Sequence, residues 1–165
     1  MLKSLLLLLK AAKLGPILKT VVTMILSVGA YALVWGWRYA AGFVGLIFCH
    51  EMGHFLAARQ RGLPVGTPTF IPFVGAWIQL DRMPHDVETE AYVGIAGPVF
   101  GSGAALVCYF AGQSRGSDLL IALAYSGFLL NLFNLIPLSP LDGGRITAIV
   151  SPRIWLVGIP ILLAL

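Results

Sequence analysis

Five consecutive residues, His50-Glu51-Met52-Gly53-His54, have the types and spacing of a catalytic metal motif. Residues four apart lie on one face of a helix, so both imidazoles can hold the same metal ion. Glu51 lies about 100° further round the helix, where its carboxylate can act on a water molecule at the metal. The pattern predicts metal-dependent hydrolysis, with His50 and His54 as ligands and Glu51 as the general base.

The sequence around this motif is typical of a membrane protein. Residues 39–49 carry no charge, and the whole chain is 58% hydrophobic and only 11% charged. Soluble domains have about 25% charged residues. The net charge of +4 does not indicate nucleic acid, because the basic residues are spread along the chain and many flank apolar spans. A hydrolase motif in a predicted membrane helix indicates cleavage of a peptide bond within the bilayer.

The elements that must position the motif are transmembrane helices. The 165 residues have room for four or five spans of about 20 residues each. We expect an all-α membrane protein that forms one polytopic domain over residues 1–165. It begins with a basic interfacial helix (1–16). A catalytic core (17–145) follows, with spans at 17–35, 39–58, 91–112 and 119–138. The last span (146–165) is interrupted by prolines and ends without a polar tail, as an incomplete span does.

The basic residues predict the orientation of these spans. If the N-terminus is cytoplasmic, the four lysines before residue 20 and the pair Arg59 and Arg61 all face the cytoplasm. Arg38 and Arg115 are then the residues left for the outer loops. Since cytoplasmic loops carry an excess of Lys and Arg, we predict a multi-pass integral membrane protein with a cytoplasmic N-terminus.

The segment after the motif helix is expected to be irregular or extended. Residues 62–80 contain too many prolines and glycines for a helix. They are rich in β-branched and aromatic residues, which favours a small β element over residues 67–80. At membrane depth such backbone must be covered by protein or line a wet cavity.

A catalytic zinc site usually needs a third protein ligand, and three carboxylates compete for this role. Glu88 and Glu90 lie in the polar stretch after the β element, and Asp142 follows the fourth span. Asp142 stands behind two prolines and ahead of Gly143-Gly144, where the backbone can turn closely around a site. A carboxylate at membrane depth is costly unless a cation pairs with it, which favours Asp142.

The two motifs together resemble those of the site-2 protease family of intramembrane zinc metalloproteases. The later motif reads Asn134-x-x-Pro137-x-x-x-Leu141-Asp142-Gly-Gly, and the resemblance covers about residues 43–145. It implies one Zn²⁺ per chain, held by His50, His54 and Asp142, with Glu51 as general base and acid. The chain resembles a compact member of that family, without the PDZ or CBS domain that many members carry.

The resemblance also implies how a substrate is handled. The stretch around residues 70–80 is similar to the family's membrane-associated strands, which are thought to pair with an unwound transmembrane segment of a protein substrate. Asn134 matches a family asparagine that handles substrate or stabilises the reaction centre. The implied activity is that of an intramembrane zinc metalloendopeptidase.

Other readings of these residues remain open at this point. A non-catalytic membrane metal-binding or metal-transport protein could use the same two histidines and aspartate. A catalytically silent family member could do so as well. A metal carrier, however, has no need of Glu51 as a base beside the metal. Asn134 could instead make a hydrogen bond between helices, and we expect a structural role for Asn131.

Three glycines form a small-residue stripe that predicts close helix packing: Gly94, Gly97 and Gly101.

Overall fold

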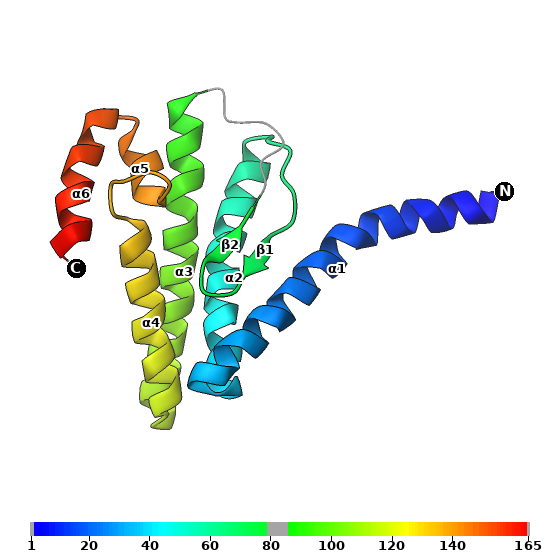
Figure 1. Cartoon of the computed structure of the whole chain (residues 1–165), viewed down its shortest axis with the longest axis horizontal. Helices are drawn as coiled ribbons and strands as arrows, with labels where there is room; N and C mark the ends of the chain where they lie inside the picture. The colour runs from blue at the N-terminus through cyan, green and yellow to red at the C-terminus, as the bar shows by residue number, and fades with distance from the viewer. Residues whose placement is uncertain (1, 79–85, 165) are drawn as a thin grey trace.

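The computed structural model of the chain is a helical assembly with a two-stranded sheet beside it, which confirms the predicted fold class (Figure 1). It describes residues 2–78 and 86–164, with side chains from residue 15 onward except at residues 77 and 152. The elements are α1 (Leu2–Trp35), α2 (Trp37–Gln60), β1 (Thr69–Ile71), β2 (Gly75–Trp77), α3 (Val87–Arg115), α4 (Asp118–Asn134), α5 (Asp142–Thr147), the 3-10 turn η1 (Pro152–Ile154) and α6 (Trp155–Ala164).

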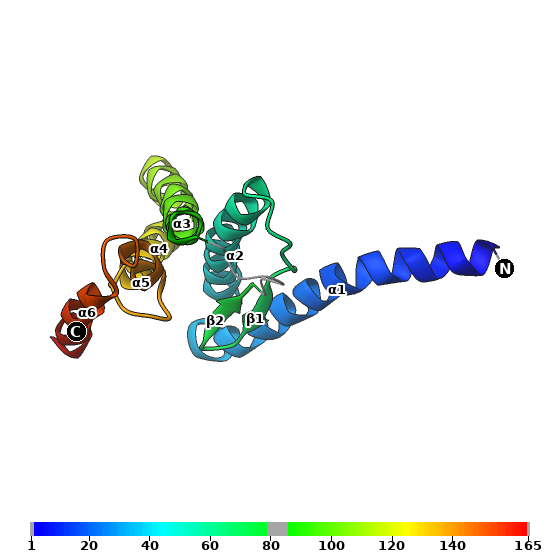
Figure 2. The same cartoon turned by 90° about the horizontal axis from the view of Figure 1, so that it is seen from above.

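The centre of the fold is α3, which packs against α2, α4 and α5 (Figure 2). It begins where the Asp86 side chain accepts a hydrogen bond from the Thr89 amide at 2.7 Å, and it ends at Gly116 in the left-handed conformation. Where α2 meets α3, a Cβ at Gly53 would overlap the carbonyl oxygen of Ala96. Glycine therefore lets the motif helix approach α3 closely.

Three of the described helices are long and apolar enough to cross a membrane. They are residues 15–35 of α1, the whole of α2 and the whole of α3. The spans predicted over 17–35, 39–58 and 91–112 lie within them. The α4 and α6 helices are apolar but shorter. α4 ends at Asn134 instead of the predicted 138, because the residue before Pro137 is disfavoured in a helix.

Both ends of the chain differ in detail from the expected elements. α1 is one helix that includes Pro16, so the predicted interfacial segment and the first span are parts of a single helix whose N-terminal end projects away from the bundle (Figures 1 and 2). The predicted span over 146–165 is divided among the end of α5, η1 and α6. Pro152 has no amide hydrogen to continue a helix, so it stands at the start of a new one.

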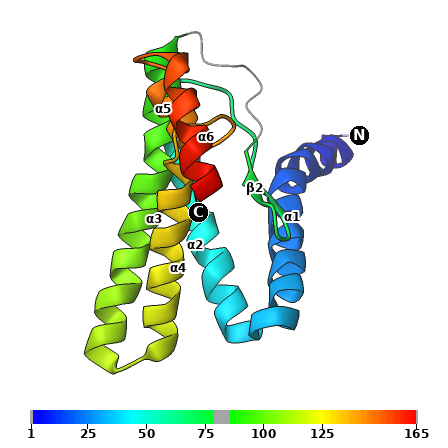
Figure 3. The same cartoon turned by 60° about the vertical axis from the view of Figure 1, so that its left-hand side comes forward.

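The sheet is a β-hairpin that lies between α1 and α2, within the predicted range of 67–80 (Figures 2 and 3). β1 and β2 are antiparallel, with Thr69 opposite Trp77. Side chains of α1 hold the hairpin. Thr20 Oγ1 donates to the carbonyl of Pro68 at 2.5 Å, Thr23 Oγ1 accepts from the Phe70 amide at 3.2 Å, and Tyr31 Oη accepts from the Phe73 amide at 3.1 Å.

Candidate metal centre

Three buried side chains from two helices meet at one point. His50 and His54 lie one turn apart on α2, and their Nε2 atoms are 3.1 Å from each other. Asp142 is the first residue of α5, and its Oδ2 lies 3.1 Å from His50 Nε2 and 3.2 Å from His54 Nε2. All three residues are less than 9% exposed. The three atoms thus form a small triangle inside the protein.

The glycine pair after Asp142 allows this approach. A Cβ at Gly143 would overlap the carbonyl oxygens of residues 135 and 136. A Cβ at Gly144 would overlap the backbone of residues 138–139. The first turn of α5 is therefore pressed against the chain that leaves α4, and this contact carries the carboxylate back toward α2.

Hydrogen bonds on the far side of each imidazole ring decide which nitrogen faces the triangle. His54 Nδ1 lies 2.8 Å from the carbonyl oxygen of Val93, so this nitrogen must carry the proton. His50 Nδ1 lies 2.8 Å from Oδ1 of Asn131, whose Nδ2 donates to the carbonyl of Gly127 at 2.7 Å. The amide oxygen therefore accepts from His50, and both Nε2 atoms face the triangle with a lone pair.

The donor set fits a metal ion. With both Nδ1 atoms protonated, the two Nε2 atoms and the Asp142 carboxylate are all acceptors, and Oδ2 is buried without a hydrogen-bond partner among the described residues. Acceptors 3.1–3.2 Å apart repel one another unless a cation lies between them. Two imidazoles and a carboxylate are ligands that zinc prefers in catalytic sites, where a fourth position stays open. The group can hold one metal ion.

Glu51 lies next to the triangle, on the cavity that gives access to it. Its side chain is largely buried, and it lines a cavity of about 390 Å³ together with the three candidate ligands. The hairpin contributes Ala76 and Ile78 to this cavity, and the chain around the end of α4 contributes Asn134 and residues 139–140. A cavity of this size can admit a short extended peptide and water.

The competing carboxylates lie elsewhere. Glu88 Oε1 is 3.5 Å from Nη2 of Arg61, and Glu90 Oε1 is 3.5 Å from Nε of Arg145. Glu90 lines the cavity but pairs with Arg145, so of the three carboxylates it is Asp142 that the structure brings to the histidines.

The two asparagines of α4 have different surroundings. The Asn134 amide donates to the carbonyl of Leu130 at 3.0 Å and borders the cavity. Asn131 makes a hydrogen bond from α4 to His50 on α2, which confirms the structural role expected for it. The sequence did not predict that its partner would be a candidate metal ligand. The signal for this contact in the sequence is that Asn131 is a polar side chain one turn before Asn134 in an otherwise apolar helix.

Sequence comparisons identify what this chain is similar to. Residues 38–124 match the family described as Peptidase family M50. A zinc metalloprotease of Methanocaldococcus jannaschii is 33% identical over 83% of this chain and 41% of its own length. The putative zinc metalloprotease Rip3 of Mycobacterium tuberculosis is 31% identical over 73% of this chain and 33% of its own length. The chain therefore spans about two fifths or less of these curated relatives.

The fold has a counterpart among solved structures. The structure titled site-2 protease from Methanocaldococcus jannaschii superimposes with a TM-score of 0.60 and 26% sequence identity. The match covers 86% of this chain and 69% of the other. The chain therefore shares its fold with that structure over most of its length.

Proposed function

Because the chain belongs to peptidase family M50, the site-2 protease family, we propose that it is an intramembrane zinc metalloprotease. Its substrate is a membrane protein, and the bond it hydrolyses lies in or near a transmembrane segment. The observation that carries this proposal is the convergence of His50, His54 and Asp142 beside Glu51 on one cavity. The relatives' printed names, zinc metalloprotease, support zinc as the metal.

His50, His54 and Asp142 are the residues that would hold the zinc ion. When bound, zinc supplies Lewis-acid activation of water and of the scissile carbonyl. Glu51, largely buried at the cavity, accepts the proton of the attacking water and delivers it to the leaving amine. Asn134 uses one N–H for the carbonyl of Leu130 and keeps a second, which can donate to the oxyanion or to the substrate backbone.

The hairpin is the element that we assign to substrate binding. A helical segment hides its peptide bonds, so it must unwind before cleavage. β2 pairs with β1 along one edge, and residues 76 and 78 border the cavity on the side of α2. An unwound segment can pair with the other edge of β2 as an added strand. Residues 17–145 would then contain the complete catalytic core.

Basic residues at the C-terminal end of α2 support one orientation of the chain in the membrane. The candidate metal group lies toward the C-terminal end of α2, which closes with Arg59 and is followed by Arg61. We place this end, like the N-terminus, on the cytoplasmic side. A fragment cut free at this depth would be released to the cytoplasm.

The direct test uses the protein purified in detergent. We expect one zinc per chain, cleavage of a set of transmembrane peptides, and loss of cleavage when a chelator removes the metal. Glu51→Gln should keep the zinc and abolish cleavage, because it removes the base and leaves the three ligands. A variant that cuts at the wild-type rate would refute the role of Glu51. A zinc-loaded wild type that cuts none of the peptides would favour a metal-binding or transport protein.

A further inference from the structure

We infer that Asn131 is a positioning residue for the candidate metal centre. Its amide holds the His50 ring in the tautomer whose Nε2 lone pair faces His54 and Asp142. This inference rests on the proposed role of His50 as a metal ligand. It gives a function to a residue that lies outside both sequence motifs and does not touch the cavity.

The Asn131 side chain lies where three helices meet. It projects from α4, is 2% exposed, and reaches His50 on α2. On its third side is α3, where a Cβ at Gly101 would overlap the Asn131 amide. The carboxamide is therefore enclosed by all three helices.

The same contacts determine which way the amide faces. Nδ2 donates to the carbonyl of Gly127 at 2.7 Å, and Oδ1 accepts from His50 at 2.8 Å. A flipped amide would direct its oxygen at the carbonyl of Gly127 and lose that hydrogen bond. The α4 backbone thus orients the Asn131 amide, and the amide in turn keeps the proton of His50 on Nδ1.

The two histidines are held by partners of different kinds. His54 donates to the backbone carbonyl of Val93, which no substitution removes. His50 donates to a side chain, which a substitution does remove. Outer hydrogen bonds of this kind fix the orientation of metal-binding histidines, and losing one typically weakens metal binding about 10- to 100-fold.

Asn131→Leu tests the inference because it keeps a side chain branched at Cγ and removes both hydrogen bonds. The His50 Nδ1–H would lose its acceptor, and the tautomer with the proton on Nε2 would no longer be disfavoured. We expect the affinity for zinc, titrated as zinc chloride against a competing chelator, to fall about 10- to 100-fold. If Asn131 has only a packing role, the metal-free protein loses thermal stability and zinc affinity stays at the wild-type value.

Asn134→Leu is the matched control. It removes the same kind of amide from the same helix, one turn away, where the amide bonds to Leu130 and not to a histidine. We expect this variant to keep the wild-type affinity for zinc. Asn131→Leu with wild-type affinity would overturn the inference. A wild type that takes up no zinc would overturn the proposed function instead.

A second measurement needs no variant. The chain has three histidines, so ¹⁵N-histidine NMR of the zinc-loaded protein can report the protonated nitrogen of each ring. We expect His50 and His54 both to carry the proton on Nδ1 and to bind through Nε2, with the third signal removed by His85→Gln. Binding of zinc through Nδ1 of His50 would overturn the inference even if Asn131→Leu fails to fold.

Discussion

The imidazole of His54 occupies the space that a side chain at Gly97 would need. A Cβ at Gly97 would overlap Nε2, Cε1 and Cδ2 of that ring. The glycine stripe of α3, which the sequence predicts to serve helix packing, thus also shapes the candidate metal centre. Gly101 leaves room for Asn131, and Gly94 faces residues 142–146 of α5. Each glycine of the stripe accommodates a different part of the site.

Gly97→Ala should therefore impair metal binding. The added methyl group would force the His54 ring to move, and His54 would lose its alignment with His50 and Asp142. We expect zinc affinity to fall about tenfold or more, measured by competition with a chelator. Gly103→Ala is the control, because a Cβ at Gly103 meets no atom within 4 Å. Equal zinc affinities in the two variants would show that the His54 ring can move aside and still align with His50 and Asp142.

Asp142→Ala should remove the third ligand, and with it the carboxylate that would offset the charge of a bound metal ion. Loss of an outer hydrogen bond weakens zinc sites by about 10- to 100-fold, and loss of a ligand should exceed that range. Zinc content after dialysis measures the effect. Glu90→Gln, which removes the carboxylate that pairs with Arg145, should keep its zinc. The opposite result would transfer the ligand role to Glu90.

Tyr31→Phe tests whether the hairpin serves the substrate. Tyr31 Oη accepts from the Phe73 amide at 3.1 Å, and the two rings pack edge to face at 4.9 Å. Losing the hydrogen bond should cost about 1 kcal/mol and loosen the hairpin. We expect unchanged zinc content and a higher KM for transmembrane peptides.

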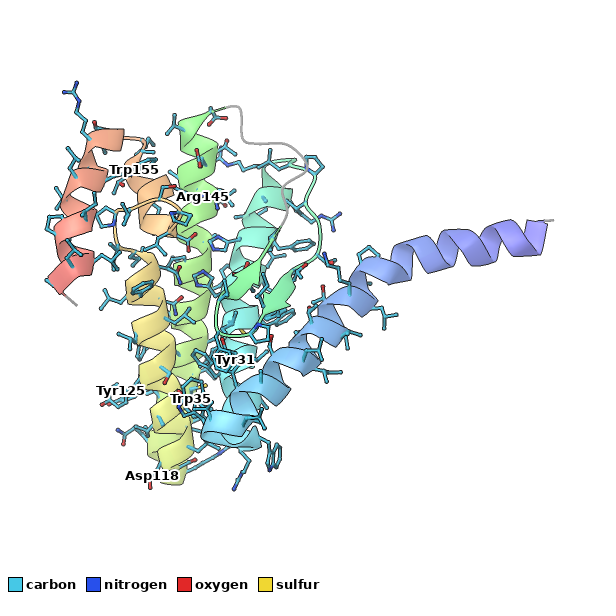
Figure 4. All side chains as sticks on the ribbon, in the orientation of Figure 1. Tyr31, Trp35, Asp118, Tyr125, Arg145 and Trp155 are labelled. Carbon is cyan, nitrogen blue, oxygen red and sulfur yellow. The ribbon has the colours of Figure 1, made fainter. Side chains whose placement is uncertain are left out.

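Tyr125→Phe is the control for that change, since Tyr125 is 65% exposed on the outer side of α4 (Figure 4). It should leave both zinc content and KM unaltered. If KM rises equally in both variants, or rises in neither, the proposed role of the hairpin in substrate binding is wrong.

Trp155→Phe should destabilise the contact between α5 and α6. The Trp155 indole donates to the carbonyl of Gly144 at 3.0 Å, and Arg145 and Trp155 lie at the same end of the molecule (Figure 4). We expect the free energy of unfolding to fall by about 1 kcal/mol, measured by denaturant titration in detergent. Trp37→Phe, at a ring that is 70% exposed, should have no comparable effect. If the two variants are equally stable, α6 contributes little to holding α5.

The parts of this protein that follow from local physics could be predicted from its sequence. Helical periodicity aligns His50 with His54, continuous apolar runs predict the spans within α1, α2 and α3, and prolines with β-branched residues predict the hairpin. Each of these inferences depends on neighbours within one element. Asp142 was favoured by its flanking prolines and glycines and by the family resemblance, although no periodicity connects it to α2.

Only the tertiary structure decided how distant residues meet. It brings Asp142 to within 3.2 Å of both histidines, while Glu90 turns to Arg145. It also directs Asn131, and not Asn134, to His50. The helices that touch, and the height along their axes at which they touch, determine the partner of each side chain. They thereby also determine which ring nitrogen carries the proton. That packing depends on glycines and carbonyls far apart in the chain, so no local pattern contains it.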